Sequence, residues 1–177
     1  AADCTAAADA SVDFAQYAGI NMMFNADLDG YAWGGSLSLL LDGVDKLWMP
    51  TWLPPWGYED LAVLHHEMTH AYGILWHSMV YGQAYIDSWD VVSDPYAGCF
   101  GGSPDDPVYG CLGQHTHAYH RYYLGWIPPE RVVVAGPGTT RVTLERATQP
   151  VTTNPLLVVI PIEGSTTHFY AVEARQT

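Results

Sequence analysis

Four histidines and one glutamate lie within fourteen residues of this chain, in the segment HHEMTHAYGILWHS from His65 to Ser78. His66 and His70 are four residues apart, and on a helix this spacing puts both imidazoles on one face, where they can bind the same metal ion. Glu67 follows His66 on the same turn. This is where a general base must lie to take a proton from a zinc-activated water. The spacing therefore predicts a hydrolytic zinc site.

The residues around the histidines predict the helix that such a site needs. Glu59 and Asp60 lie in the first turn of the predicted helix, where the helix dipole favours acidic side chains, and Gly73 is a natural C-terminal stop. An apolar stripe with helical spacing is expected to face the core, formed by Leu61, Leu64, Met68, Ala71 and Leu75.

The rest of the chain is predicted to contain mainly strands. Before the histidines, the alanine-rich start has a helical pattern, and strands are predicted over residues 17–25, 35–42 and 46–52. The last of these, KLWMPTW, is expected to be exposed. After an irregular region to about residue 113, a helix is predicted over 114–126 and strands over 131–136, 141–147, 156–162 and 168–175. These elements indicate an α+β fold with a twisted mixed sheet.

The segment HEMTHAYGILWH resembles the extended zinc signature H-E-x-x-H-x-x-G-x-x-H of the metzincin metallopeptidases. In that family a glycine ends the helix and the chain turns back with a third ligand. Here three residues separate Gly73 from His77 where the signature has two, and Trp76 stands at the ligand position. We expect a loop that is longer by one residue to bring His77 to the metal as the third ligand. The resemblance thus implies zinc held by His66, His70 and His77, with Glu67 as the catalytic base.

Three later stretches are similar to gametolysin-like and immune-inhibitor-A-like secreted peptidases: YIDSWDVVSDP, HAYHRYYLGWIPPERV and HFYAVEARQ. The first carries a methionine turn beneath the metal in those families, and Val92 stands here in place of that methionine. The resemblance covers roughly residues 12–176. It implies one metzincin-like catalytic domain over residues 1–177, with an N-terminal subdomain 1–73 and an irregular, β-rich C-terminal subdomain 74–177. A propeptide or further N-terminal elements outside this chain are also expected.

The charge and hydrophobicity of the chain indicate which classes of binding partner to expect. Six basic residues against nineteen acidic ones give a net charge of −13, which would repel a phosphate backbone, so nucleic acid is not expected as a partner. The chain contains no run of eighteen apolar residues, so no membrane span is predicted. The expected partner is a protein or peptide substrate.

The cysteines indicate the compartment. Cys99 and Cys111 bracket the glycine- and proline-rich stretch CFGGSPDDPVYGC, which predicts a disulfide and therefore a secreted, extracellular protein. Cys4 is left without a partner in this chain.

Other residues also suggest metal binding. His115, His117 and His120 lie within the predicted helix 114–126. They are interpreted as a second metal site, as residues acting near the substrate or, preferably, as surface histidines beside packed tyrosines. Lone His168 is expected to be structural. The segment NADLDG begins like a calcium loop, but Ser36 stands where such a loop needs glutamate, so Ca²⁺ is only a weak alternative to a polar turn.

The expected function is zinc-dependent hydrolysis of peptide bonds in extracellular proteins, with the substrate paired along strand 46–52. Tyr81, Tyr85 and Tyr96 are candidates to donate a hydrogen bond to the oxyanion. Two other interpretations stay open. One is a zinc-binding domain with little or no catalysis, because His77 is displaced and the methionine is missing. The other is an adhesion or carbohydrate-binding module, because the chain has seven tryptophans and twelve tyrosines.

Overall fold

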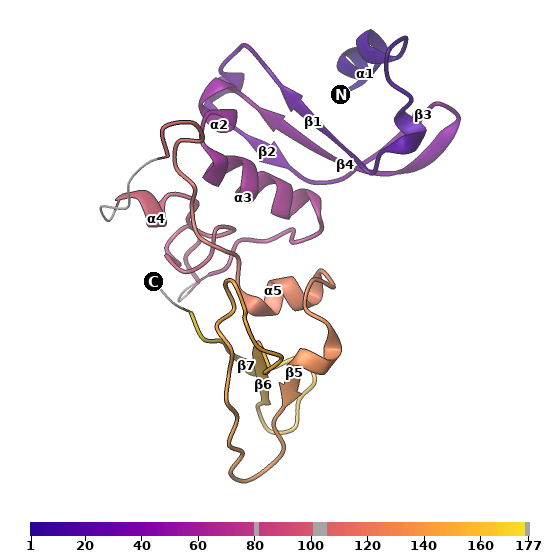
Figure 1. The fold of residues 1–177 in the computed structure, drawn as a ribbon. Coiled ribbons are helices and arrows are strands. Elements are labelled where there is room, and N and C mark those ends of the chain that lie inside the picture. Colours follow the sequence, from indigo (N-terminus) through magenta and orange to yellow (C-terminus); the bar gives the residue numbers. More distant parts are fainter. Residues whose placement is uncertain (80–81, 101–105, 176–177) are drawn as a thin grey trace. The chain divides into compact units, whose positions relative to one another are not determined.

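The computed structural model describes residues 1–79, 82–100 and 106–175, and it forms a mixed α/β fold with two mixed sheets and few helices (Figure 1). The chain divides into two compact units, residues 1–114 and 115–177. The subdomain boundary expected after residue 73 falls inside the first unit, because residues 91, 109 and 111 fold back and bond to the histidine-bearing helix. No helix among the described residues has the length and apolar character needed to cross a bilayer.

The first unit is built on a sheet around one long strand, β4 (Val44–Leu53). β1 (Gly19–Met23) runs parallel to β4, whereas β2 (Trp33–Gly34) and β3 (Leu37–Leu41) are antiparallel to it. β3 and β4 form a hairpin, because the intervening Asp42-Gly43 pair adopts the positive φ angles (49° and 75°) that a tight hairpin turn needs. The strands predicted over 17–25 and 35–42 are therefore confirmed as β1 and β3.

The expectation that segment 46–52 is an exposed strand is wrong. This segment is the centre of β4, which pairs with all three other strands of its sheet. Trp48, Thr51 and Leu53 are fully buried. Pro50 is compatible with this central position, because it has no N–H to donate but its carbonyl accepts a hydrogen bond from the N–H of Gly35.

Helix α3 (Leu61–Ala71) lies against β2 and β4 and carries the histidine motif. The close approach depends on Gly34, because a Cβ atom there would lie 1.7 Å from the carbonyl oxygen of Glu67. The buried side chains of α3 differ from the expected apolar stripe and are Ala62, Val63, His66, Glu67, Thr69, His70 and Ala71. Leu75 lies beyond the helix and is exposed, because the positive φ of Gly73 (118°) turns the chain away.

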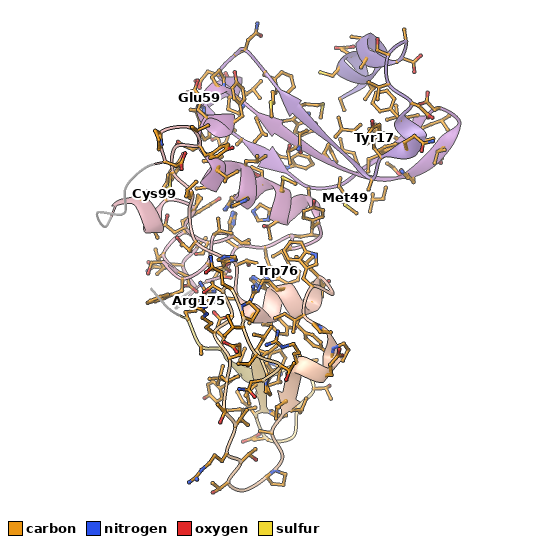
Figure 2. The ribbon with its side chains drawn as sticks, in the orientation of Figure 1. Tyr17, Met49, Glu59, Trp76, Cys99 and Arg175 are labelled. Carbon is orange, nitrogen blue, oxygen red and sulfur yellow. A yellow bond between two sulfur atoms is a disulfide. The ribbon has the colours of Figure 1, made fainter. Side chains whose placement is uncertain are left out.

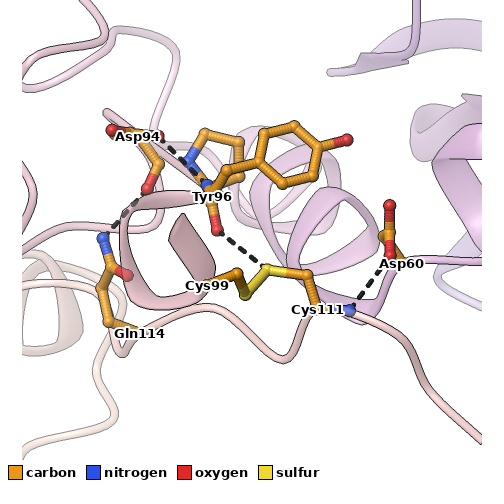
Figure 3. The surroundings of a disulfide bond; sticks show 7 residues. Asp60, Asp94, Tyr96, Cys99, Cys111 and Gln114 are labelled. Atoms are coloured by element: carbon orange, nitrogen blue, oxygen red, sulfur yellow. Dashed lines mark hydrogen bonds between the residues drawn. A yellow bond between two sulfur atoms is a disulfide. The ribbon is translucent and has the colours of Figure 1, made fainter. Parts of the chain in front are cut away.

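The predicted disulfide, Cys99–Cys111, is present and helps to fix the start of α3 (Figure 3). Two N–H groups in the first turn of the helix, those of Leu61 and Ala62, donate to the carbonyls of Tyr109 and Cys111. In return, the Asp60 carboxylate accepts the N–H of Cys111 at 3.0 Å. The segment next to the disulfide therefore satisfies helix donors that no side chain caps.

The second unit has its own small core beneath a three-stranded sheet. Its elements are α5 (Ala118–Tyr123), β5 (Val132–Val134), β6 (Leu157–Pro161) and β7 (Phe169–Val172). β6 is central, parallel to β5 and antiparallel to β7. The buried cluster consists of Ala118, Ile127, Ala147, Leu156 and Leu157. The strand predicted over 141–147 does not form, since its only strand-like pairing with the described residues is an isolated bridge between Arg146 and Ala174.

The remaining elements are short. They are α1 (Ala2–Ala8), α2 (Pro55–Tyr58), α4 (Ala97–Phe100) and the 3-10 turns Phe14–Gln16, Leu28–Gly30 and Pro129–Arg131. Cys4, in α1, forms no disulfide.

Candidate metal centre

His66 and His70 project from one face of α3 and meet at their Nε2 atoms, which are 3.1 Å apart. Both side chains are buried, with 6% and 8% of their surface exposed. The i, i+4 spacing of the helix is sufficient to bring the two rings together.

His77 joins this pair from beyond the helix, although one extra residue separates it from Gly73. After the turn at Gly73 the chain reverses, with the N–H of Ile74 bonded to the carbonyl of Thr69. The Nε2 atom of His77 then lies 3.3 Å from those of both His66 and His70. The wider loop thus brings the third imidazole to the other two, whereas Trp76 is half exposed.

The spacing of the three nitrogens fits a tetrahedral metal ion. Zinc–nitrogen bonds of about 2.0–2.1 Å at tetrahedral angles separate the ligand nitrogens by roughly 3.3 Å, and the observed separations are 3.1, 3.3 and 3.3 Å. Among the described residues, these histidines are the one group of three or more metal-ligating side chains close enough to share an ion.

The protonation of the rings also suits a metal. The Nδ1 atom of His66 lies 2.7 Å from the carbonyl oxygen of Val91, and that of His70 lies 2.5 Å from the carbonyl of Ile74. A carbonyl can only accept, so each Nδ1 carries the proton and each Nε2 presents a lone pair. Burial lowers the pKa of His66 to about 4 and also lowers the pKa values of His70 and His77. The rings are therefore neutral at pH 7.

The turn Asp90–Ser93 provides support for the three rings. Val91 contributes the carbonyl that orients His66, and Val92, in place of the methionine of the resembling families, is fully buried. Asp90 is fully buried as well. Its carboxylate accepts the Ser78 hydroxyl and the N–H of Val92, while the Ser93 hydroxyl donates to the Ser78 carbonyl at 2.9 Å. Through these hydrogen bonds, Asp90 and Ser93 hold Ser78, the residue that follows His77, in position.

We expect Asp90→Asn to weaken metal binding by about 10- to 100-fold, the usual effect of removing a group that orients a ligand. The amide loses the charge near two of the imidazoles and alters the bond to Ser78. Competition with a chromophoric chelator measures the affinity. Asp87→Asn is the matched control, since the Asp87 carboxylate, in the same loop, accepts the N–H of Trp89. Equal affinities for the two variants would contradict this role.

Glu67 lies beside the histidines and is almost fully buried, with 8% of its surface exposed. Burial raises the pKa of its carboxyl to about 7, although a hydrogen bond from the N–H of Gly34 acts in the opposite direction. A carboxyl that titrates near neutrality can both accept and return a proton. Glu67 therefore has the properties of a general acid–base group.

One of the three candidate tyrosines lies at the site. The ring of Tyr85 is centred 4.2 Å from that of His77 and 6.3 Å from that of His66. Its φ of 63° holds the residue in a left-handed conformation that non-glycine residues rarely adopt. Tyr96 instead lies beside Asp94 and the disulfide (Figure 3), and Tyr81 is outside the described residues.

The histidines of the second unit have other partners. The Nδ1 atom of His117 lies 3.5 Å from the Glu173 carboxylate, and that of buried His120 lies 3.2 Å from the Thr116 hydroxyl. His115 contributes its carbonyl to Arg175. Exposed His168 bonds to Ser165 and Thr167. The alternative of a second metal site therefore gains no support within the described part of the chain.

The calcium-like segment also has a structural role. The Asp27 carboxylate accepts the indole N–H of Trp56 at 3.0 Å. Asp27 and Asp29 belong to no group of three or more converging His, Cys, Asp or Glu side chains among the residues that the structure describes.

Glu173 should make the second unit sensitive to acid. Burial acts to raise the pKa of this carboxyl, but His117, Arg175 and the N–H of Ala118 stabilise the charged form, and the net pKa is lowered. Because the pKa of Glu173 is lower in the folded state, its ionised carboxylate stabilises the fold at pH values above the ordinary glutamate pKa. This stabilisation is lost as the pH falls through the lowered, folded-state pKa.

Thermal unfolding followed by circular dichroism between pH 6 and 3 measures this effect. We expect the midpoint of the wild type to fall more steeply toward low pH than that of Glu173→Gln. Glu130→Gln, at an exposed position, should retain the wild-type profile. Parallel profiles for the wild type and Glu173→Gln would contradict the assignment.

Comparison of the chain with protein-family models, with curated proteins and with solved structures finds no match in any of the three. The function can therefore be inferred only from the chemistry of these residues.

Proposed function

We propose that this chain is a zinc-dependent endopeptidase with a metzincin-like active site. The observation that carries the proposal is the convergence of three imidazole Nε2 atoms, 3.1–3.3 Å apart, beside a buried glutamate that is not one of them. Three neutral histidines on one ion, with a fourth position left for a reactant, are typical of catalytic zinc sites. A purely structural zinc site usually has four protein ligands instead.

The metal and the residues have separate tasks. Bound Zn²⁺ supplies a Lewis acid that lowers the pKa of a water and polarises a carbonyl group. His66, His70 and His77 would hold the ion through their Nε2 atoms. The Glu67 carboxylate accepts the proton of the attacking water and returns it to the nitrogen of the departing amine. Gly34 orients that carboxylate through its N–H.

The proposed peptide substrate pairs with β2 instead of β4. β4 has its neighbours on both edges, whereas β2 is an edge strand in the described sheet. Gly34 in β2 packs directly on the backbone of Glu67. A peptide added to this edge by main-chain hydrogen bonds would therefore pass beside the proposed base. Because the chain has a disulfide, we also propose that it acts in an extracellular setting.

Chelation tests the proposal directly. The purified protein should contain about one zinc per chain and hydrolyse casein. Removal of the metal with a chelator should abolish hydrolysis, and added zinc should restore it. Circular dichroism before and after chelation is the control for folding. A folded protein that binds no zinc, or that binds zinc without any hydrolysis, would contradict the proposal.

A further inference from the structure

A recess of about 320 Å³ opens on the first unit and is lined by Phe24, Leu28, Tyr31, Trp33 and Trp52. The lining includes the cross-strand pair Trp33–Trp52, whose rings stack with centroids 4.3 Å apart. Tyr31 is 75% exposed and Trp33 is 36% exposed. Single exposed aromatic residues are common, but a stacked pair within an apolar recess is typical of a ligand site.

The loop at the rim of the recess has an unusual backbone. Leu28, Asp29 and Gly30 have successive positive φ angles of 50°, 56° and 80°. Two of these residues are not glycine, so the conformation is strained and must be held by its surroundings. The Asp27 carboxylate, bonded to the indole of Trp56, anchors the beginning of this loop. This bond holds the beginning of the loop that brings Leu28 and Tyr31 to the recess.

The register of β2 connects the recess to the proposed catalytic centre. Trp33 is next to Gly34, the residue in contact with Glu67. The N–H of Gly35 points inward to Pro50, whereas that of Gly34 bonds to Glu67. Since backbone groups alternate along a strand, the N–H and C=O of Gly34 point to the opposite edge, where the N–H is bonded to Glu67 and the C=O can accept a hydrogen bond from a peptide. A peptide strand paired there would place one residue directly opposite Trp33.

The side chain of that peptide residue would extend the row that Trp52 and Trp33 begin. Directly opposed residues on neighbouring strands project from the same face, with Cβ atoms about 4.5–5.5 Å apart. An aromatic side chain at this position would meet the edge of Trp33 and cover the recess.

We propose that the recess formed by Phe24, Leu28, Tyr31, Trp33 and Trp52 is a specificity subsite that takes an aromatic side chain of the peptide substrate, from the residue opposite Trp33 and close to the cleaved bond. This inference rests on the proposed peptidase function. The volume of about 320 Å³ lies at the lower end of the range of about 300–1,000 Å³ for small-ligand sites, and one aromatic side chain fits within it. The apolar lining favours an aromatic side chain over a sugar, whose hydroxyl groups need several polar partners.

Cleavage of a peptide library, with products identified by mass spectrometry, tests the subsite. The wild type should show enrichment of Phe, Tyr or Trp at one fixed position from the cleaved bond. This enrichment should fall roughly tenfold or more in Trp33→Ala and in Tyr31→Ala. Tyr31 is mostly exposed, so its variant is expected to fold even if Trp33→Ala does not. Tyr17→Ala is the control, because Tyr17 is an exposed aromatic residue outside the recess, just before β1 (Figure 2).

A binding measurement gives a readout that does not depend on turnover. A fluorescent peptide with the preferred aromatic residue should bind the Glu67→Gln protein about ten times more tightly than its alanine counterpart. Tyr31→Ala, introduced into the same protein, should remove the difference.

The outcomes separate the two proposals. Hydrolysis without an aromatic preference, or with a preference that both recess variants retain, overturns the subsite and leaves the peptidase function standing. A zinc-free or inactive wild type overturns both. A change in tryptophan fluorescence with a neutral oligosaccharide, but not with the aromatic peptide, overturns the subsite in favour of carbohydrate binding.

Discussion

Glu67→Gln is expected to abolish peptide hydrolysis while leaving zinc bound. The amide cannot accept the proton of the attacking water, and loss of a general base typically lowers the rate by about 10²- to 10⁴-fold. Zinc should remain, because Glu67 is not in the converging histidine group. The fold should also remain, because the amide oxygen can still accept the N–H of Gly34. The measurements are kcat/KM on a defined peptide and the zinc content of the same preparation.

Glu59→Gln is the matched control for this prediction. Glu59 is an exposed glutamate just before α3, so the substitution makes the same change in charge away from the site. Its activity should equal that of the wild type. If Glu67→Gln retained full activity, another group would be the base. If wild-type and variant proteins both bound zinc and neither hydrolysed peptides, a zinc-binding domain without catalysis would be the better description.

His77→Ala is expected to lower zinc affinity by at least ~100-fold and to remove hydrolysis with it. Two imidazoles remain on α3, but the third nitrogen that closes the site is gone, and even groups that only orient a ligand contribute about 10- to 100-fold. Titration against a chromophoric chelator measures the affinity. The substitution should not unfold the protein, because His77 lies in an irregular segment outside the core.

His168→Ala is the control for His77→Ala, since His168 is an exposed histidine of the second unit. It should keep one zinc per chain. Retention of zinc by His77→Ala with wild-type affinity would contradict the ligand assignment. The search would then turn to a nearby carboxylate, with Asp90 the first to substitute, because it bonds to Ser78 next to His77.

Local patterns in the sequence are sufficient to predict the part of the site on one helix. The spacing of His66 and His70 fixes their common face, because a helix repeats every 3.6 residues. The end of the helix at Gly73 and the disulfide between Cys99 and Cys111 were predicted in the same way, and both are present. The strands β1, β3, β5, β6 and β7 also follow from short runs of β-forming residues.

Long-range contacts, in contrast, were not visible in these patterns. The burial that raises the pKa of Glu67 depends on tertiary packing, which includes the packing of β2 on α3 at Gly34. The support that Asp90 and Ser93 give to Ser78 was missed, although the polar residues of the segment WDVVS were the available signal. The buried position of β4 was also missed, since strand pairing is made by backbone groups that every residue carries.

The sequence by itself determined the chemistry that this protein has available: two imidazoles on one helical face, a carboxylate on the same turn, and a further histidine after a helix-ending glycine. Only the tertiary structure decided that His77 meets the other two rings, that His117 and His120 bond to other groups, and that β2 lies at the edge of the sheet beside Glu67. The physical reason is that helical spacing is set by neighbours within a few residues, whereas a loop's path and a strand's partners depend on contacts between residues far apart in the chain.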